Sequence, residues 1–491
     1  MSRINTNISA LTTIRQLIGN QDDLATRLER LSSGFQINRG ADDPAGLIAS
    51  EALRSEIRGI NAAIDNSTRA INVISTADAA LAEVSKLLLE VKQLVSSSTN
   101  SGAISDEEIQ ANQLQIDSLL ESINRVANST TFNTKKLLNG QLGYTVSAQN
   151  QADLPRLQIF GARVPAGGTL PVTVQVTQSA LTAQLTISAG GTSGLSAAGG
   201  SASLSATNNV TIEVRGRLGT ETFTFTGGTT VSSIATTVAS FKNLTGVSAS
   251  LITASAGATG ISFNSISYGS DEFVSVREIT GTFNVTPGDQ GDTEDRGRDA
   301  TVLVNGQAAS VKGLVARVRS SGLDMVVDLS TAFGTTLGSS VFGITGGGAN
   351  FQIGSTVGSD GLVSIGIPSL HSSNLGSTAA GFLNMIASGG NYSITNPDNH
   401  PKAADIVAAA ITQVAVLSGR LGGFQANQIE TNLNSQRVAL ENVTASESAI
   451  RDTDYATEVA NLTRAQILVQ ATTQILGVAN QIPQNVLALL R

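Results

Sequence analysis

The feature that most constrains what this chain can fold into is a seven-residue apolar repeat near its C-terminus. The repeat consists of Leu468, Ile475, Ile482 and Leu489, with Val478 and Val486 on neighbouring positions of the same helical face. An apolar repeat of seven is typical of a helix that packs along a partner helix. We therefore expect the C-terminal segment to be a long helix whose apolar face requires a partner.

A second apolar stripe lies at the opposite end of the chain. Its members recur three or four residues apart and are Ile4, Ile8, Leu11, Ile14 and Ile18, continued by Leu24, Leu28 and Leu31. At ~1.5 Å per residue, a helix of about 30 residues is a rod on the order of 45 Å long, which cannot cover its own apolar face. We expect the two terminal helices to pack against each other and against copies of the chain, so that these stripes form a polymerisation core.

Patterns between the two ends predict further long helices. The dipeptide Asp43-Pro44 is a favourable helix start, because Asp caps the first turn and a proline at the first helical position loses no hydrogen bond. This helix is expected to run to about residue 97, and the capping box Ser105-x-x-Glu108 predicts another to about residue 128. Later patterns predict a helix from roughly 402 to 450 and an N-cap for the last helix at 452–454.

The middle of the chain has a different composition. Of the 49 glycines, 38 lie between residues 141 and 400, where charged residues are few and Thr, Ser and Val are frequent. Segments such as 222–226, with the sequence TFTFT, alternate in residue type and are separated by glycine pairs, which predicts short strands and turns. We therefore predict an α+β fold, with long coiled-coil-like terminal helices, further helices beside them and an inserted β-rich region.

Composition also argues against several classes of function. With no Cys and only two isolated histidines, His371 and His400, the chain offers no zinc-thiolate site and no Cys nucleophile. The formal charge of −8 argues against binding to nucleic acid or to an anionic membrane. No uninterrupted apolar run approaches the ~18 to 20 residues that span a bilayer. We expect a structural or binding protein that is not an enzyme and needs no metal or cofactor.

Four sequence blocks are more specific than the periodicity. They are ERLSSGFQIN at 29–38, ADDPAG at 41–46, ASESAIRDTD at 445–454 and NQIPQNVL at 480–487. These blocks closely resemble bacterial flagellin, in the same order, over roughly residues 1–140 and 410–491. The resemblance implies a homopolymer subunit that is exported through the flagellar type III apparatus and polymerises into the extracellular filament used for motility. The N-terminal segment has no Sec-type signal pattern, which agrees with that route.

The resemblance also implies a division into layers. Residues 1–43 and 455–491 would form an inner-tube coiled coil, residues 44–180 and 346–454 a helical shell domain with a β-turn region, and residues 181–345 a variable β-rich outer part. By the same resemblance, partners would be an export chaperone, the filament cap and hook-junction proteins.

One stretch of the expected shell bears on a further partner. The run Glu90-Val91-Lys92-Gln93-Leu94 occupies the place where many flagellins have an arginine-valine-arginine-glutamate-leucine run that an innate immune receptor contacts. Val91 and Leu94 keep their identity, whereas Glu90 reverses the charge of the first arginine. We therefore expect weak receptor activation and interpret the apolar residues of this face as shell packing; they are Leu88, Val91, Leu94 and Val95.

Two alternatives remain open at this point. A hook–filament junction protein shares the same terminal helices but acts as an adaptor in few copies. An adhesive or glycan-binding role of the middle segment would leave no motif in the sequence. Homopolymerisation distinguishes the filament subunit from the junction protein.

Overall fold

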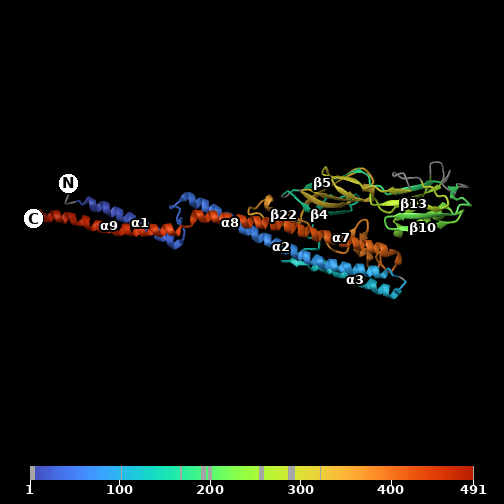
Figure 1. The fold of residues 1–491 in the computed structure, drawn as a ribbon, viewed down its shortest axis with the longest axis horizontal. Coiled ribbons are helices and arrows are strands. Elements are labelled where there is room, and N and C mark those ends of the chain that lie inside the picture. The colour runs from blue at the N-terminus through green and yellow to red at the C-terminus, as the bar shows by residue number, and fades with distance from the viewer. Residues whose placement is uncertain are drawn as a thin grey trace. The chain divides into compact units, whose positions relative to one another are not determined.

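The structure is a computed structural model that describes residues 6–100, 102–165, 168–188, 195–196, 202–253, 259–285, 293–320 and 322–489. It divides into two compact units (Figure 1). Unit 1 comprises Met1–Arg69, Gln352–Leu362 and Ile429–Arg491, and unit 2 comprises Ala70–Phe351 and Val363–Gln428. Long helices at both ends and a β-rich middle confirm the predicted α+β fold.

The helices begin and end close to their predicted limits. They are α1 (Ile8–Ser33), α2 (Pro44–Ser98), α3 (Asp106–Ser129), α7 (His400–Phe424), α8 (Thr431–Arg451) and α9 (Tyr455–Leu489). The capping box before α3 is present, since the Ser105 hydroxyl accepts from the Glu108 N–H at 3.3 Å and the Glu108 carboxylate accepts from the Ser105 N–H at 3.0 Å. The N-cap of α9 is Asp454, which accepts hydrogen bonds from the N–H groups of Ala456 and Thr457.

The segment predicted as one helix from 402 to 450 contains a π-helical turn, η4 (Gln425–Glu430). The buried residues along this segment are Leu417, Leu421, Phe424, Ile429 and Leu433. The step from Phe424 to Ile429 is five residues rather than three or four. The wider turn keeps both residues on the buried side, where an uninterrupted α-helix would rotate one of them away.

The helical part of unit 2 is held together by the apolar faces of α2, α3 and α7. Their fully buried side chains include Leu81, Leu88 and Val95 of α2, Ile116 and Ile123 of α3, and Val407 and Leu421 of α7. Polar contacts fix the same helices: Ser418 donates to Asp78 at 2.6 Å, and Asn112 donates to Ser98 at 3.0 Å. The helix spanning 397–451 is long and apolar enough to cross a membrane. The apolar face of its α7 part, however, lies in this core.

Unit 2 also contains two β-structured cores. The first lies between a five-stranded sheet, in the order β16-β15-β5-β20-β3, and a four-stranded sheet, in the order β17-β18-β19-β4. Their bounds are β3 (Tyr144–Ser147), β4 (Arg156–Ala162), β5 (Leu170–Gln178), β15 (Thr301–Val304), β16 (Gln307–Ala308), β17 (Ser310–Lys312), β18 (Val315–Arg319), β19 (Leu323–Asp328) and β20 (Gly338–Gly347). All pairings in these two sheets are antiparallel, and Val174, Phe342 and Met325 are buried between them.

The second β core is built from strands between residues 184 and 296 and from one short helix among them. Its sheets run β10-β9-β13-β14 and β11-β12-β6. The elements are β6 (Gln184–Ser188), β9 (Val210–Gly216), β10 (Thr220–Phe225), α4 (Val231–Ser240), β11 (Val247–Thr253), β12 (Thr259–Ser265), β13 (Phe273–Thr280) and β14 (Glu294–Arg296). Ile187, Val214 and Phe263 from the sheets pack with Ile234 and Val238 of α4. Each core alternates buried and solvent-facing residues along its strands, as the TFTFT pattern predicts.

Candidate assembly surfaces on the terminal helices

The terminal helices α1 and α9 lie side by side in unit 1 (Figure 1). Among the α9 side chains that the structure describes, up to residue 481, the buried ones are seven residues apart and are Glu458, Ala465, Thr472 and Ala479. Between them lie the half-buried Leu462, Val469 and Leu476, again seven apart. The corresponding face of α1 consists of Ala10, Thr13, Leu17, Asn20, Leu24, Arg27 and Leu31, which alternate in steps of three and four. The two helices therefore meet along a heptad seam, which we call the α1–α9 seam.

Small and polar side chains occupy much of this seam. Ala465 is 1% exposed, and Ala10 and Ala479 are also buried. The Asn7 amide donates to the Ala479 carbonyl oxygen at 2.8 Å, and the Asn20 amide donates to the Thr472 hydroxyl at 3.4 Å. Small residues let two helices approach closely, and side-chain amides can bridge them only in one alignment. The seam therefore specifies how the helices pair while burying few large apolar groups.

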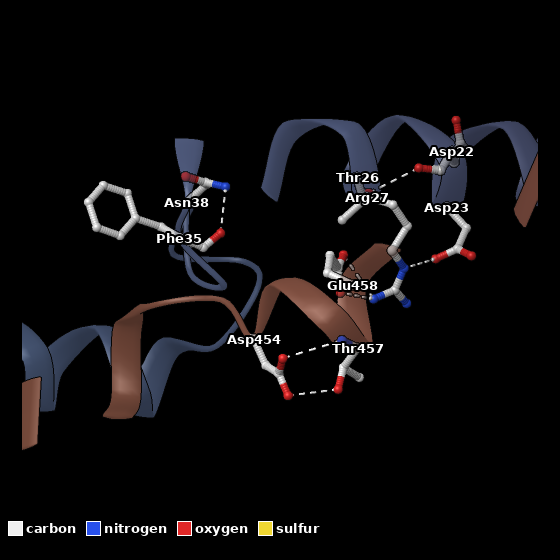
Figure 2. A network of polar contacts seen from close by, with 9 residues as sticks. All are labelled: Asp22, Asp23, Thr26, Arg27, Phe35, Asn38, Asp454, Thr457 and Glu458. Atoms are coloured by element: carbon white, nitrogen blue, oxygen red, sulfur yellow. Dashed lines mark hydrogen bonds and ion pairs between the residues drawn. The ribbon is translucent and has the colours of Figure 1, made fainter. Parts of the chain in front are cut away.

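One ion pair lies near the C-terminal end of α1 and the N-terminal end of α9 (Figure 2). Arg27 of α1 places Nη1 3.3 and 3.2 Å from the two carboxylate oxygens of Glu458 on α9, and its Nε is 3.1 Å from Asp23. The Glu458 side chain is 7% exposed and that of Arg27 is 24% exposed. A carboxylate this deeply buried is tolerated only when it is paired, so Arg27 and Glu458 tie the two helices together at one register.

The segment between α1 and α2 is tied to the junction of α8 and α9. Gly34 ends α1 with φ +75°, and its carbonyl accepts from Thr453 at 2.9 Å. Gln36 N–H donates to the Arg451 carbonyl at 2.7 Å, and the Arg451 guanidinium lies 4.8 Å from the centre of the Phe35 ring. A glycine suits the left-handed conformation at position 34. One hydrogen-bonded junction therefore holds the C-terminal end of α1 beside the N-terminal end of α9.

Two carboxylates cap the ends of this junction. The N–H of Arg39 donates to Asp42 at 2.8 Å and lowers the pKa of that carboxyl below its usual value. Asp454 accepts from the Thr457 hydroxyl at 2.8 Å (Figure 2), and this hydrogen bond lowers the pKa of Asp454. Both groups are therefore anionic at neutral pH and hold turns of the backbone rather than a ligand.

Most of the apolar residues predicted to form the polymerisation core lie outside the α1–α9 seam; Leu24 and Leu31 of the predicted stripe are the exceptions, since they line the seam. Exposed side chains are Ile8, Leu11, Ile14, Ile18 and Leu28 on α1, and Leu468, Ile475 and Val478 on α9. Their exposed fractions run from 40% at Ile14 to 60% at Val478. These residues do not make the α1–α9 seam, which differs from the expectation that the same stripes pair with each other. Each terminal helix thus has two apolar faces, one paired within the subunit and one uncovered.

Four of the predicted core residues cannot be placed in this way. Ile4 lies outside the described residues. The helix α9 continues through Pro483 to Leu489, but the side chains of Ile482, Val486 and Leu489 also lie outside the described residues.

Comparison with known proteins decides the family. The profile of the bacterial flagellin N-terminal helical region matches residues 4–142, and that of the C-terminal helical region matches residues 404–490. The flagellin of Salmonella typhimurium is 30% identical to this chain, and the alignment covers 99% of each protein. The chain belongs to the bacterial flagellins. It is a structural subunit of the flagellar filament.

Other relatives agree with this assignment. The B-type flagellin of Pseudomonas aeruginosa is 28% identical over 99% of each chain.

A solved hook-associated protein 3 from Legionella pneumophila aligns with 82% of this flagellin and 98% of its own chain, at 11% identity and a TM-score of 0.32. That structural similarity is too low to support the hook-junction alternative.

The face expected to pack in the shell is partly buried within unit 2 of this flagellin. Leu88, Val91 and Val95 have at most 1% of their surface exposed, and Leu94 is half-buried. Glu90 is exposed. Within the subunit, the valines therefore face the core of unit 2, and a binding partner would meet the exposed residues of this run, which are Glu90, Lys92 and Gln93.

Sequence reasoning missed the residues that pair α1 with α9. The missed residues are Asn7, Ala10, Thr13, Asn20, Arg27, Glu458, Ala465 and Thr472. A signal existed, since positions 458, 465, 472 and 479 repeat every seven residues. This repeat consists of small, hydroxyl and charged side chains, which hydrophobic periodicity does not detect.

Among the described residues, no group of three or more His, Asp or Glu side chains lies close enough together to hold a metal ion. His371 bonds to Ser369 and Asn128, and His400 bonds to the Ile394 carbonyl oxygen. Both histidines thus have hydrogen-bond partners that account for their positions.

Proposed function

We propose that this flagellin polymerises by burying the uncovered apolar rows of α1 and α9 against the same helices of neighbouring copies. The observation that carries the proposal is the two-faced character of these helices. The α1–α9 seam already covers one face of each helix. Rows of isoleucine, leucine and valine side chains would otherwise remain in water along rods 26 and 35 residues long. Fully burying one exposed large apolar side chain stabilises an assembly by about 1.5 to 3 kcal/mol, and these side chains, which are already about half covered, would each contribute roughly half of that.

The proposed subunit is layered in the filament. Residues 1–43 and 455–491 form the inner tube, residues 44–180 and 346–454 the shell, and residues 181–345 the solvent-facing part. The heptad seam supports the first assignment, because it is a coiled-coil contact between the two ends of the chain. The buried faces of α2, α3 and α7 support the second, because they make a stable helical body without the terminal helices.

The proposed route and partners follow from the family. The chain is exported through the flagellar type III apparatus with a chaperone, adds beneath the filament cap and continues from hook-junction proteins, which places it outside the cell. We propose no catalysis and no cofactor, because the proposed function is the packing of identical subunits against one another. Before assembly, the uncovered apolar rows of α1 and α9 would make the monomer prone to aggregate. We propose that the chaperone binds the terminal helices and covers these rows during export.

Seeded elongation tests the proposal. Purified full-length chain is added to short filament fragments, and filament length is followed by electron microscopy. We expect long filaments from the parent chain and none from the Ile14→Asp variant. The matched control is Gln16→Asp, an equally exposed position on the same helix that carries no apolar side chain. Normal elongation by Ile14→Asp would overturn the assignment of this face, and failure of the parent chain to elongate would favour the junction protein.

A further inference from the structure

A cavity of about 610 Å³ lies within unit 2, between α7 and the four-stranded sheet β17-β18-β19-β4. The sheet lines this cavity, which we call the α7 cavity, with the face opposite the first β core. Its apolar lining consists of Phe160, Val315, Val326, Pro368, Val416 and Leu417. Small-molecule sites have volumes in this range and combine an apolar lining with a few convergent polar groups. The α7 cavity is therefore large enough for a small molecule, and its polar groups decide which kind.

The walls of the α7 cavity are held together by arginine side chains. On α7, Arg420 donates to Asp324 of β19 at 2.7 Å, and its guanidinium lies 3.8 Å from the centre of the Phe160 ring on β4. On β4, Arg156 donates to the Gly376 carbonyl oxygen at 2.7 Å. These contacts fix the helix, the sheet and the segment that contains Gly376 to one another. The cavity is therefore pre-formed, which keeps the entropy cost of binding a ligand low.

Positive charge exceeds negative charge around the cavity. The charged lining residues are Arg156, Lys312, Arg317 and Asp328. Lys312 forms an ion pair with Asp271 at 2.6 Å, but in the part of the chain that the structure describes, neither arginine has a carboxylate within 4 Å. Burial raises the pKa of the Asp328 carboxyl and so disfavours its charged form. The α7 cavity therefore favours an anion.

Two polar side chains flank an apolar one on the cavity side of the sheet. Arg317 of β18 is paired with Val326 of β19, and Val326 is paired with Gln158 of β4. Neighbouring strands are about 4.8 Å apart, so the backbones at Arg317 and Gln158 are about 10 Å apart with Val326 between them. Among the described residues, neither the Arg317 guanidinium nor the Gln158 amide has a hydrogen-bond partner. An anion above Val326 would be within reach of both donors from opposite sides.

We propose that the α7 cavity binds a small organic carboxylate. The carboxylate accepts hydrogen bonds from the Arg317 guanidinium and the Gln158 amide, and the apolar body of the ligand lies between Val326 and Val416. A guanidinium matches the two oxygens of a carboxylate. Inorganic phosphate has oxygens on every side, and those facing the two valines would lose their hydrogen bonds to water without replacement. The inference is independent of the proposed polymerisation, since every lining residue belongs to one subunit.

Binding to the full-length monomer tests the proposal, with hexanoate as the probe. Ligand-observed NMR compares hexanoate with hexanamide, which has the same apolar body without the charge, and with inorganic phosphate. We expect saturable binding of hexanoate and about tenfold weaker binding of the other two ligands. Arg317→Gln should weaken hexanoate binding by about tenfold or more, because it removes the charged donor. The matched control is Arg319→Gln, on the same face of β18 but outside the cavity lining and 88% exposed, which should leave hexanoate binding unchanged.

Alkylation of a thiol in the cavity gives a second readout. The chain has no cysteine, so Val326→Cys carries a single thiol, whose thiolate displaces iodide from iodoacetate, a small organic carboxylate, or from neutral iodoacetamide. The ratio of the two rates removes the intrinsic reactivity of the thiol and reports how strongly its surroundings prefer a carboxylate. We expect this ratio to be about tenfold higher at position 326 than in Val341→Cys, whose site on β20 is exposed and outside the cavity lining. Saturating hexanoate should remove the difference.

Equal binding of hexanoate and of either comparison ligand would overturn the inference. Equal losses from Arg317→Gln and Arg319→Gln would also overturn it, because they would show a general attraction of charge rather than a site. Equal rate ratios at positions 326 and 341 would do the same. Thermal unfolding of each monomer checks that the variants fold. Seeded elongation is measured separately, so failure of the carboxylate site leaves the proposed function intact.

Discussion

The Arg27–Glu458 pair makes a quantitative prediction about assembly. Replacing Glu458 with Gln leaves the Arg27 guanidinium in the α1–α9 seam without its carboxylate partner. Breaking a buried pair costs about 3 to 5 kcal/mol, and we lower this to about 2 kcal/mol because Arg27 keeps a quarter of its surface in water and retains Asp23 at 3.1 Å. An effect of about 2 kcal/mol is about thirtyfold in an equilibrium constant.

The assay is the critical concentration for seeded elongation, measured for Glu458→Gln, Arg27→Gln and the double variant. Glu458→Gln should raise it by about thirtyfold, and Arg27→Gln by more, because it leaves the more deeply buried Glu458 carboxylate unpaired. The double variant should cost less than the two effects combined, because it leaves no unpaired charge buried in the seam. The control is Glu29→Gln, which breaks the solvent-exposed Arg39–Glu29 pair and should change little. A Glu458→Gln chain that elongates as the parent does, or effects that simply add, would refute the idea that this pair sets the helix register.

Four further outcomes are expected. Ala465→Leu should overpack the seam by about 1 to 3 kcal/mol and suppress elongation, while an unfolding scan shows unit 2 unchanged. Ser105→Ala should lower the unfolding free energy by about 1 kcal/mol in denaturant titrations, through loss of the α3 cap. Burial raises the pKa of Asp328, so the folded state binds its proton more tightly than the unfolded state does, and Asp328→Asn should stabilise unit 2 more at pH 7 than at acidic pH in calorimetry. Purified monomer should activate the innate immune receptor weakly in a reporter-cell assay, because the exposed Glu90 reverses the charge of the arginine that many flagellins have at this place; strong activation at low concentration would contradict this.

The long helices could be predicted because their signals are local. Asp43-Pro44 and the Ser105–Glu108 capping box predict the starts of α2 and α3, and the periodic apolar residues predict their buried faces. The π-helical turn could not be predicted, since its evidence is a five-residue step from Phe424 to Ile429 that matches neither a helix nor a strand template.

The sequence predicts the pairing of α1 with α9 but not the residues of its seam, for a physical reason. Apolar periodicity finds the faces of α1 and α9 that need covering, but it does not say whether the cover comes from the same chain or from another. In the structure, the same chain covers Ala465, Thr472 and Glu458 in the α1–α9 seam. Large apolar residues such as Ile475 remain exposed on the subunit. The strand registers of the first β core depend on pairings across more than a hundred residues, such as Val302 with Val176, which no local pattern encodes.

The most direct test of the central claim is a filament reconstruction by electron microscopy that resolves α1 and α9. We predict that Ile8, Leu11, Ile14 and Ile18, with Leu468, Ile475 and Val478, lie within van der Waals contact of the terminal helices of neighbouring copies, while Arg27 and Glu458 stay paired within each subunit. A reconstruction in which the apolar rows face solvent, or in which the contacts between copies run through the α1–α9 seam instead, would contradict the account.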